Sequence, residues 1–542
     1  MKTIFDFLKE QKEKYVEDYD LKNWVPEYIG DISLIDKIID PDEKFLVICH
    51  VDGDCDGISS YVILDELFNQ FCIPNYIHIS SRKEGYGLNN TRTEDLFKLA
   101  IKKKEDEGLD DYKICLLTAD LGITNKKQVS FAKDIGFDCV IITDHHTVDP
   151  ESLPDKADLI VNMKIQNDEK LWLCGAGLVY MLYHQYSNQK MKLFAGNATI
   201  VDMVEIPYGS INRTIVKEAI EILRNQQIED RDTFYFLNKV IYRFGENKID
   251  ENVFGFNIGP SINSLSRLGN EELIKEYFTL ESRGKKYALD KIEKNNKNRK
   301  AIQAGYEERI VSMIKEEELD KDRIAIVVLP FAEASIVGLV SSFIMSNYGV
   351  DNLCLAPTAD PNKYKGSGRS SKFKIYEFIK ELKKRYDING GGHSNACGIS
   401  ISKESVDKLL EDYSVGRLND IVLKENPKDN EGGVYEINYD EMTDPSIIKT
   451  IDHYAPYGQK NPKPTLLIRN LKIINVKKSG SHMFLDCECE SEEDTWETPF
   501  IKVISFKVYD KKERKKYKNN RYIDVLGSLN GQDIIADKVI FL

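Results

Sequence analysis

The sequence has few of the features that mark secreted, membrane-spanning or fibrous proteins. Its 542 residues include ten cysteines, none spaced as Cys-x-x-Cys, and Cys487 and Cys489 are the closest pair. This scatter argues against a zinc ribbon and a disulfide framework, and predicts reduced thiols in a cytoplasmic protein. No apolar run approaches the roughly 18 residues of a membrane span. Residues 1–10 also lack the pattern of a secretory signal.

Excess positive charge is also missing, because 75 Lys and Arg face 89 Asp and Glu, for a net charge of −14. This balance argues against a protein that coats nucleic acid non-specifically and suits an enzyme that gathers carboxylates around metals. Three segments are locally basic: 283–300, 363–385 and 507–521. They are either solvated faces or surfaces that follow a single nucleic-acid strand.

The chain length predicts about three or four domains. Residues 45–205 alternate short apolar runs with helical patterns such as Tyr61–Phe71, which is typical of βαβ units and a parallel sheet. The predicted strands are Phe45–Cys49, Asn75–Ile79, Lys113–Leu117, Cys139–Thr143 and Leu159–Val161.

The rest of the chain changes character three times. Residues 210–315 read as helical and contain a long connecting helix, a second α/β segment begins at Arg323–Leu329, and a linker-like stretch covers 424–433. Apolar runs then predict a small β-barrel: Thr465–Arg469, Leu471–Val476, His482–Cys487 and Phe500–Val508. We therefore expect an α/β multidomain protein with the following segments: 1–280, 281–315 (the connecting helix), 316–423 and 424–542.

Acidic and imidazole side chains follow the predicted strands. The first strand runs into His50, Asp52, Asp54 and Asp56, the third into Asp120, the fourth into Asp144, His145 and His146, and Asp202 comes from a later segment. Parallel strands place such groups at one edge of a sheet. A lone Asp after a strand is usually a helix cap. The joint pattern instead favours two divalent metals, Mn²⁺ or Mg²⁺, clamping a phosphate for hydrolysis.

These residues carry a resemblance to a known family. The His-x-Asp-x-Asp-x-Asp-Gly run at His50, the Asp before Leu-Gly and the Asp-His-His run resemble the DHH phosphoesterase superfamily. Gly390–Gly398 resembles the glycine-histidine motif of the DHH-associated domain. Further runs resemble the RecJ branch: Cys174–Gly177, Ile258–Asn263, Gly366–Ser370 and Tyr454–Pro462. The predicted C-terminal strands resemble its oligonucleotide-binding (OB) barrel.

The resemblance implies roles for the acidic and imidazole residues. It implies that His50, Asp54 and Asp120 bind one metal, and that Asp56, Asp120, His145 and Asp202 bind the second, with Asp120 bridging. It further implies that Asp52 and Asp144 orient ligands, Asp52 with the option of binding metal directly. His146 is then a phosphate contact or a proton donor to the leaving oxygen.

The resemblance also implies substrate-contacting residues. Arg82, Ser367 and Arg369 resemble a pocket for a 5′-phosphate, and an Arg guanidinium grips phosphate with two parallel hydrogen bonds. The remaining expected contacts are Asn263, Arg267, Ser370, Gly391, Gly392 and His393. Departures from the family pattern, such as Asn162-Met163 in place of Asn-Pro and Phe331–Val340 without a histidine, touch no expected metal ligand.

Three functions remain in view. The resemblance favours a metal-dependent exonuclease of single-stranded DNA that acts 5′→3′ and releases 5′-mononucleotides in DNA repair and recombination. Its expected partners are the 5′ end of single-stranded DNA, with a single-strand-binding protein or a helicase as candidates, no membrane, and a monomeric state. The alternatives are a phosphodiesterase of short oligonucleotides or cyclic dinucleotides, and a non-catalytic DNA-binding scaffold. The intact set of ligands argues against the scaffold.

Overall fold

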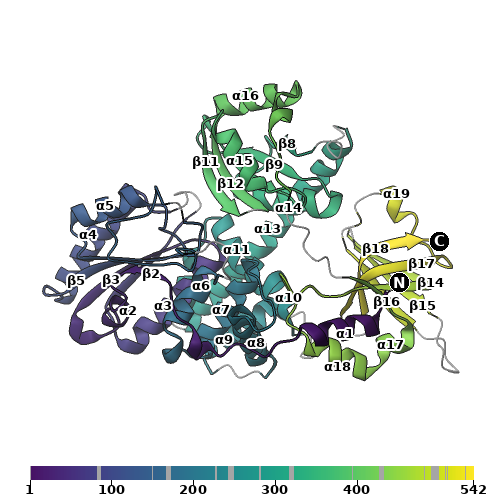
Figure 1. Ribbon diagram of the computed structural model, residues 1–542, viewed down its shortest axis with the longest axis horizontal. Helices are drawn as coiled ribbons and strands as arrows, with labels where there is room; N and C mark the ends of the chain where they lie inside the picture. The colour runs from purple at the N-terminus through teal and green to yellow at the C-terminus, as the bar shows by residue number, and fades with distance from the viewer. Residues whose placement is uncertain are drawn as a thin grey trace. The chain divides into compact units, whose positions relative to one another are not determined.

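The computed structural model divides into two compact units, residues 1–293 with 432–542, and residues 294–431 (Figure 1). The structure describes residues 2–542 except 82–86, 149, 167–171, 226–228, 242–248, 280–281, 317–322, 394, 426–432, 481, 490–499, 507, 509–510 and 531–532. Within the described residues, no helix combines the length and the apolar composition needed to cross a membrane.

The first unit contains a six-stranded sheet in the order β2-β7-β6-β5-β3-β4, parallel except for β2 at one edge. The strands are β2 (Tyr28–Gly30), β3 (Phe45–Val51), β4 (Asn75–Ile79), β5 (Lys113–Ala119), β6 (Cys139–Thr143) and β7 (Leu159–Val161). The chain passes from β3 to β4 on one side and returns to β5 on the other. The strand order therefore reverses between β3 and β5, where sheets of this kind bind ligands.

Both faces of this sheet are covered, which explains why its strands read as continuous apolar runs. Along β3, Val47 and Cys49 join one hydrophobic core, whereas Leu46 and Ile48 join the other. The first core is shared with α3 (Cys55–Phe71), α6 (Gly175–Leu182) and α7 (Gln189–Val201), and the second with α4 (Asn90–Glu107) and α5 (Lys126–Ile135).

A helical layer follows the sheet. Its elements are α8 (Ile211–Arg224), α9 (Arg231–Ile241), α10 (Glu251–Val253), the π-helix η5 (Phe254–Ile258), α11 (Gly259–Arg267) and α12 (Glu272–Thr279). Helix α13 (Ser282–Glu316) begins in the first unit and continues past residue 293 into the second. Short elements near the N-terminus are η1 (Leu21–Asn23), α2 (Leu34–Lys37) and η2 (Pro41–Glu43), and η3 (His184–Tyr186) precedes α7. The predicted long connecting helix corresponds to α13.

The C-terminal part of the first unit is a closed five-stranded barrel. Strands β14, β15, β16, β18 and β17 pair in that order, and β17 pairs back with β14. The elements of this part are β13 (Val434–Glu436), α17 (Tyr439–Thr443), α18 (Pro445–His453), β14 (Thr465–Ser479), β15 (His482–Glu488), β16 (Phe500–Ser505), α19 (Lys511–Arg514), β17 (Tyr522–Asn530) and β18 (Asp533–Phe541). Two predicted strands are merged in β14, where the ladder shifts register around Asn470, a residue with φ of 57°.

Residues from both ends of the chain build the barrel's core. Strand β1 (Lys2–Thr3) pairs in parallel with β13, and helix α1 (Ile4–Lys14) follows it. Ile4 and Phe7 are buried in the barrel's hydrophobic core, and the Phe7 ring meets Tyr435 edge-on at 5.2 Å. The start of the chain therefore contributes to the C-terminal barrel.

A buried arginine joins the barrel segment to the helical layer. Arg213 on α8 is 1% exposed, and its guanidinium donates hydrogen bonds to the carbonyls of Tyr454, Ala455 and Pro456 at 2.6–3.0 Å. Asn461 donates to two of these carbonyls as well. This network explains the position of the Tyr454–Pro462 run, because its turn presents carbonyl oxygens that a buried guanidinium can satisfy.

The second unit is a five-stranded sheet in the order β11-β12-β10-β9-β8, in which only β8 and β9 are parallel. Its elements are β8 (Ala325–Val328), α14 (Val337–Tyr348), β9 (Asn352–Pro357), β10 (Lys363–Arg369), α15 (Ile375–Lys383), β11 (Ile388–His393), β12 (Ala396–Ser402), α16 (Lys403–Ser414) and η7 (Arg417–Asp420). With this second α/β sheet and the barrel, the predicted fold class is confirmed.

One buried carboxylate of the first unit yields a prediction about stability. Glu251 is 6% exposed, and its burial, with Asp250 beside it, raises its pKa to about 7. When the pKa of a carboxyl group is higher in the folded state than in the unfolded state, its ionisation destabilises the folded protein at any pH above the unfolded-state pKa. This loss of stability grows with pH until the pH passes the folded-state pKa. We expect Glu251→Gln to stabilise the protein, by about 1 kcal/mol more at pH 8.5 than at pH 6. Thermal unfolding at both pH values measures this, and an equal gain at both would contradict it.

Candidate metal centre

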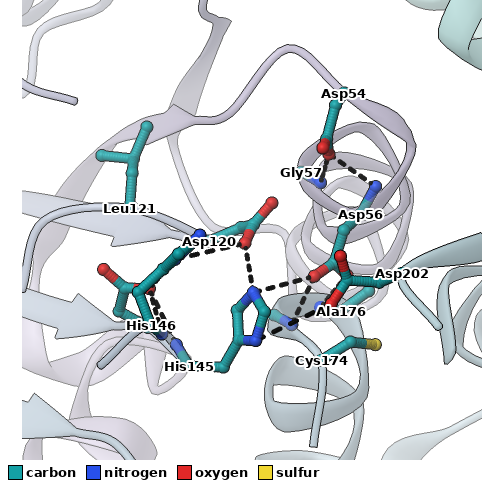
Figure 2. Close-up of polar contacts among 12 residues, drawn as sticks. Asp54, Asp56, Gly57, Asp120, Leu121, His145, His146, Cys174, Ala176 and Asp202 are labelled. Atoms are coloured by element: carbon teal, nitrogen blue, oxygen red, sulfur yellow. Dashed lines mark hydrogen bonds and ion pairs between the residues drawn. The ribbon is translucent and has the colours of Figure 1, made fainter. Parts of the chain in front are cut away.

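The acidic and imidazole groups meet at the carboxyl edge of the parallel sheet, as the strand pattern predicts (Figure 2). Three overlapping groups have ligand atoms within 4.8 Å of one another: Asp120 with His145 and His146, Asp56 with His145 and Asp202, and Asp52 with Asp54 and Asp120. Asp120 belongs to two of these groups. It connects the group that contains His145 and His146 with the group that contains Asp52 and Asp54, so the arrangement can hold more than one cation.

His145 lies at the centre of the cluster. Its Nε2 is 2.9 Å from Asp120 Oδ1 and 3.5 Å from Asp56 Oδ2, and its Nδ1 is 3.8 Å from Asp202 Oδ2. Figure 2 shows the imidazole between Asp120 on one side and Asp202 on the other. His145 and Asp120 are both nearly fully buried, with exposures of 2%. Water can therefore screen these charges only weakly.

The backbone geometry of Asp120 brings two elements together. Asp120 follows β5 with φ of 62°, in the left-handed region that aspartate tolerates better than most residues. Helix α6 begins directly against it, because a Cβ atom on Gly175 would lie 2.6 Å from Asp120 Cβ. Only a glycine at the start of α6 allows this approach.

Two carboxylates are held by helix N-termini. Asp54 caps α3 by accepting the backbone N–H groups of Asp56 at 2.9 Å and Gly57 at 3.3 Å. Asp56 accepts the N–H groups of Gly175 at 2.6 Å and Ala176 at 2.7 Å, at the start of α6. The Cys174–Gly177 run, singled out in the sequence, thus orients a candidate ligand through its backbone.

Crowding of carboxylates in a buried site raises their pKa values. Burial, and then Asp54, raises the pKa of Asp56 to about 6. Burial and the neighbouring carboxylates raise the pKa of Asp120 and of Asp202 well above the ordinary value. Such a cluster gains stability from a counter-charge, and a divalent cation supplies one.

His50 lies outside the three groups but is available as a ligand. It lies near the end of β3 next to His78 on β4, and their rings stack at 5.1 Å between centroids. Burial, helped by His78 and Arg92, lowers the pKa of His50 to about 3, so its ring is neutral near pH 7. Both ring nitrogens are buried, and neither has a hydrogen-bond partner among the residues that the structure describes. Buried imidazole nitrogens in this state suit metal coordination.

Asp144 and His146 form a pair beside the cluster. Asp144 Oδ1 lies 2.8 Å from His146 Nδ1, and its carboxylate accepts the backbone N–H groups of Ile123, His145 and His146. Burial opposes ionisation of Asp144, but His146 and these donors hold its pKa below the ordinary value. Burial likewise opposes protonation of His146, yet Asp144 raises the pKa of His146 to about 9. His146 therefore carries a proton on each ring nitrogen near pH 7.

Two expected substrate contacts lie next to the loop that carries Asp52. Asn263 on α11 accepts the backbone N–H of Cys55 at 3.0 Å, so it also fixes the start of α3. Arg267 ends the same helix. Asp52 itself accepts the Ser80 hydroxyl at 3.0 Å. Arg82, which follows β4 in the sequence, lies outside the described residues.

The other expected substrate contacts share the sheet of the second unit. On β10, Arg369 donates from Nη1 to Ser367 Oγ at 3.0 Å and from Nε to Ser342 Oγ at 3.1 Å. Ser370 is buried and caps a turn by accepting the N–H of Phe373. On β11, a Cβ on Gly391 would meet open space, whereas Gly392 has φ of 148° and no room for one. His393 is the last residue of β11.

Sequence reasoning missed three side chains beside the cluster. His78 stacks on His50, Trp172 packs at a tilt against His145, and Lys164 lies over the Trp172 ring. His78 had a signal, because parallel pairing of the first two predicted strands places it beside His50. Trp172 and Lys164 come from a loop, and the strand pattern does not place loop residues.

Comparison with known protein families gives three matches along the chain. The DHH family N-terminal domain matches residues 44–204, the DHHA1 domain matches 321–414, and the RecJ OB domain matches 435–534. The single-stranded-DNA-specific exonuclease RecJ of Bacillus subtilis is 26% identical over 467 residues, covering 83% of this chain and 55% of the relative. The RecJ of Thermus thermophilus is 24% identical over 433 residues, covering 77% and 58%.

Solved structures give the same picture of the fold. The crystal structure of RecJ with Mn²⁺ from Thermus thermophilus superposes with a TM-score of 0.67 at 17% identity, covering 94% of this chain and 69% of that one. A structure of exonuclease RecJ bound to manganese gives a TM-score of 0.55 at 20% identity, covering 72% and 94%. The chain spans a little over half the length of the curated relatives it matches. The chain therefore carries a DHH N-terminal domain, a DHHA1 domain and a RecJ OB domain, in this order, and is RecJ-like in its domains.

Proposed function

We propose that the chain is a two-metal-dependent exonuclease of single-stranded DNA that works 5′→3′, releases 5′-mononucleotides and serves DNA repair and recombination. The observation that carries this proposal is the convergence of Asp56, Asp120, His145 and Asp202 at one buried sheet edge. The relatives named single-stranded-DNA-specific exonucleases support the choice of substrate.

The donor set fits Mn²⁺ or Mg²⁺, because carboxylate oxygens dominate and imidazole is the minority. One cation position consists of His50, Asp54 and Asp120, and the second of Asp56, Asp120, His145 and Asp202. Related RecJ structures contain Mn²⁺ or Mg²⁺. Bound ions would polarise the phosphodiester and make a water molecule a better nucleophile.

The protein's own groups divide the remaining work. Asp144 accepts from His146 Nδ1, which leaves the Nε2 proton of His146 for the departing 3′-oxygen. The backbone donors of α6 keep Asp56 aimed at the cluster. Asp52, oriented by Ser80, lies with Asp54 and Asp120, so it either orders these ligands or enters the coordination sphere.

Recognition of the strand end falls to the second unit. Ser367 and Ser342 hold the Arg369 guanidinium in one orientation, ready for two parallel hydrogen bonds to a terminal 5′-phosphate. Gly391 offers backbone without a side chain in the way. Ser370, Gly392 and His393 are the remaining proposed substrate contacts of this unit, and Arg82, Asn263 and Arg267 are those of the first unit.

The function is tested directly with single-stranded DNA labelled at either end, with or without a 5′-phosphate, in the presence of Mn²⁺. We expect mononucleotides to appear first from a phosphorylated 5′ end, because a phosphate pocket would give the reaction its polarity. Absence of long-strand digestion together with rapid cleavage of a dinucleotide would contradict the proposal and favour a short-oligonucleotide hydrolase. Varying the substrate length separates the two functions better than deleting residues 425–542 from the protein. That deletion would remove the barrel and so expose Ile4 and Phe7, which are buried in its core.

Replacement of Asp120 tests the metal centre. Asp120→Ala removes the carboxylate shared by both cation positions, and we expect hydrolysis to fall by more than about tenfold, since loss of a bridging charge costs several kcal/mol of transition-state stabilisation. Asp138→Ala is the matched control. Its carboxylate accepts the backbone N–H of Ile114, at the opposite end of β5, so activity should survive. Retention of more than a tenth of the wild-type rate in folded Asp120→Ala would overturn the two-metal assignment.

Replacement of Arg369 tests the phosphate pocket. We expect Arg369→Ala to weaken binding of 5′-phosphorylated strands by about tenfold, the loss of one charge-assisted bidentate contact, and to reduce the preference for the 5′ end. Arg385→Ala provides the control, because Arg385 lies in the same unit and pairs with Asp420 at the surface. If affinity and end preference are both unchanged in Arg369→Ala, the pocket lies elsewhere.

A further inference from the structure

Trp172 packs against the ring of His145, and Lys164 packs against Trp172. The Trp172 ring lies 5.1 Å from the His145 ring between centroids, at an angle of 30°. The Lys164 ammonium lies 4.1 Å from the centre of the same indole. Lys164 is 6% exposed, which is rare for a lysine and requires a compensating partner. The face of an indole is the strongest such partner among aromatic side chains.

Hydrogen bonds hold the backbone of both residues. The N–H of Lys164 donates to Asn162 Oδ1 at 2.8 Å, and Asn162 Nδ2 donates to the carbonyl of His146 at 3.0 Å. The carbonyl of Trp172 accepts from Asn212 Nδ2, on α8, at 2.8 Å. Lys164 is therefore tied to the segment that carries His145 and His146, and Trp172 to helix α8.

The Trp172 indole contacts both the Lys164 ammonium and the His145 imidazole, so the ammonium lies one ring away from a proposed ligand of the second cation position. A fixed positive charge at this place stabilises the empty carboxylate cluster but repels a divalent cation bound there. The same charge attracts an anion, so a phosphate that arrives at the site offsets the repulsion.

We propose that Lys164 and Trp172 are positioning residues of the second cation position, in which Trp172 orients the His145 imidazole and the Lys164 ammonium couples cation binding to the presence of an anionic phosphate. This inference rests on the proposed metal-dependent function. It assigns opposite effects to two residues in direct contact. Loss of the indole frees the ligand and weakens cation binding, whereas loss of the ammonium removes repulsion and strengthens it.

The test measures the affinity of the full chain for Mn²⁺ by following the free hexaaqua ion with electron paramagnetic resonance. Each titration is carried out in the absence and in the presence of thymidine 5′-monophosphate. Without nucleotide, we expect Lys164→Met to bind Mn²⁺ about three- to tenfold more tightly than wild type, and Trp172→Leu to bind it more weakly by a similar factor. The nucleotide should increase Mn²⁺ affinity in wild type and in Lys164→Arg. That increase should shrink in Lys164→Met.

Lys190→Met is the matched control. Lys190 is also buried, at 8% exposed, and its ammonium lies 4.3 Å from the centre of the Phe278 ring. It sits at the start of α7, about 18 Å along the helix from Asp202 at the other end. Replacement of Lys190 therefore removes a buried cation–π contact, together with an ion pair to Glu66, without changing the charge near the cluster, and Mn²⁺ affinity should stay at the wild-type value.

The outcomes separate this inference from the function on which it rests. If wild type does not bind Mn²⁺, the proposed metal centre fails and the inference fails with it. If wild type binds Mn²⁺ but Lys164→Met binds it equally or more weakly, only the inference is overturned. Weaker binding in both Lys164→Met and Trp172→Leu would show that the two residues merely support the local structure.

Discussion

Mutual repulsion among buried carboxylates is the constraint around which the first unit is built. Asp56 and Asp120 are almost inaccessible to water, and Asp202 faces them across His145. An arrangement of this kind costs free energy in an isolated protein unless donors or cations compensate. Strand order, helix starts and one glycine contact all act to collect these charges, so the fold carries an energetic cost that a bound cation would relieve.

The compensation that the chain itself provides is made mostly by backbone groups. Asp54 and Asp56 each accept two N–H groups at the start of a helix, and Asp144 accepts three more. Backbone donors cannot rotate away as side chains can, so they fix the direction of each carboxylate as well as lowering its energy. Such a cluster is preorganised for a cation, because little reorganisation is needed when the ion arrives.

Much of this edge was predictable because the strands obey simple rules. Strands buried on both faces read as unbroken apolar runs, so β6 and β7 match their predicted bounds. The edge strand β4 matches its predicted bounds as well, although Asn75 and His78 interrupt its apolar pattern. The polar residues that follow these strands fall at the same edge of the sheet. Helix α3 begins at Cys55, earlier than the predicted start at Tyr61, because Asp54 caps it. Asp54 also reads as a candidate metal ligand, so the sequence pattern does not reveal that it begins a helix. The barrel's use of Ile4 and Phe7 depends on contacts between chain ends more than 400 residues apart, and no local pattern reports such contacts.

The residues that escaped prediction share a physical reason. His78, Lys164 and Trp172 act through ring stacking and a cation–π contact, which depend on the relative placement of loops and neighbouring strands rather than on spacing along the chain. Their effect on the cluster differs from that of the carboxylates. The carboxylates and the helix N-termini determine how strongly a cation is attracted. The indole of Trp172 instead orients one ligand, and the ammonium of Lys164 adds a positive charge that the occupied site must accommodate. A site designed only for tight cation binding would exclude the ammonium. Its retention against Trp172 is understandable if the occupied state includes an anion, because a phosphate then offsets the repulsion between the ammonium and the bound cations.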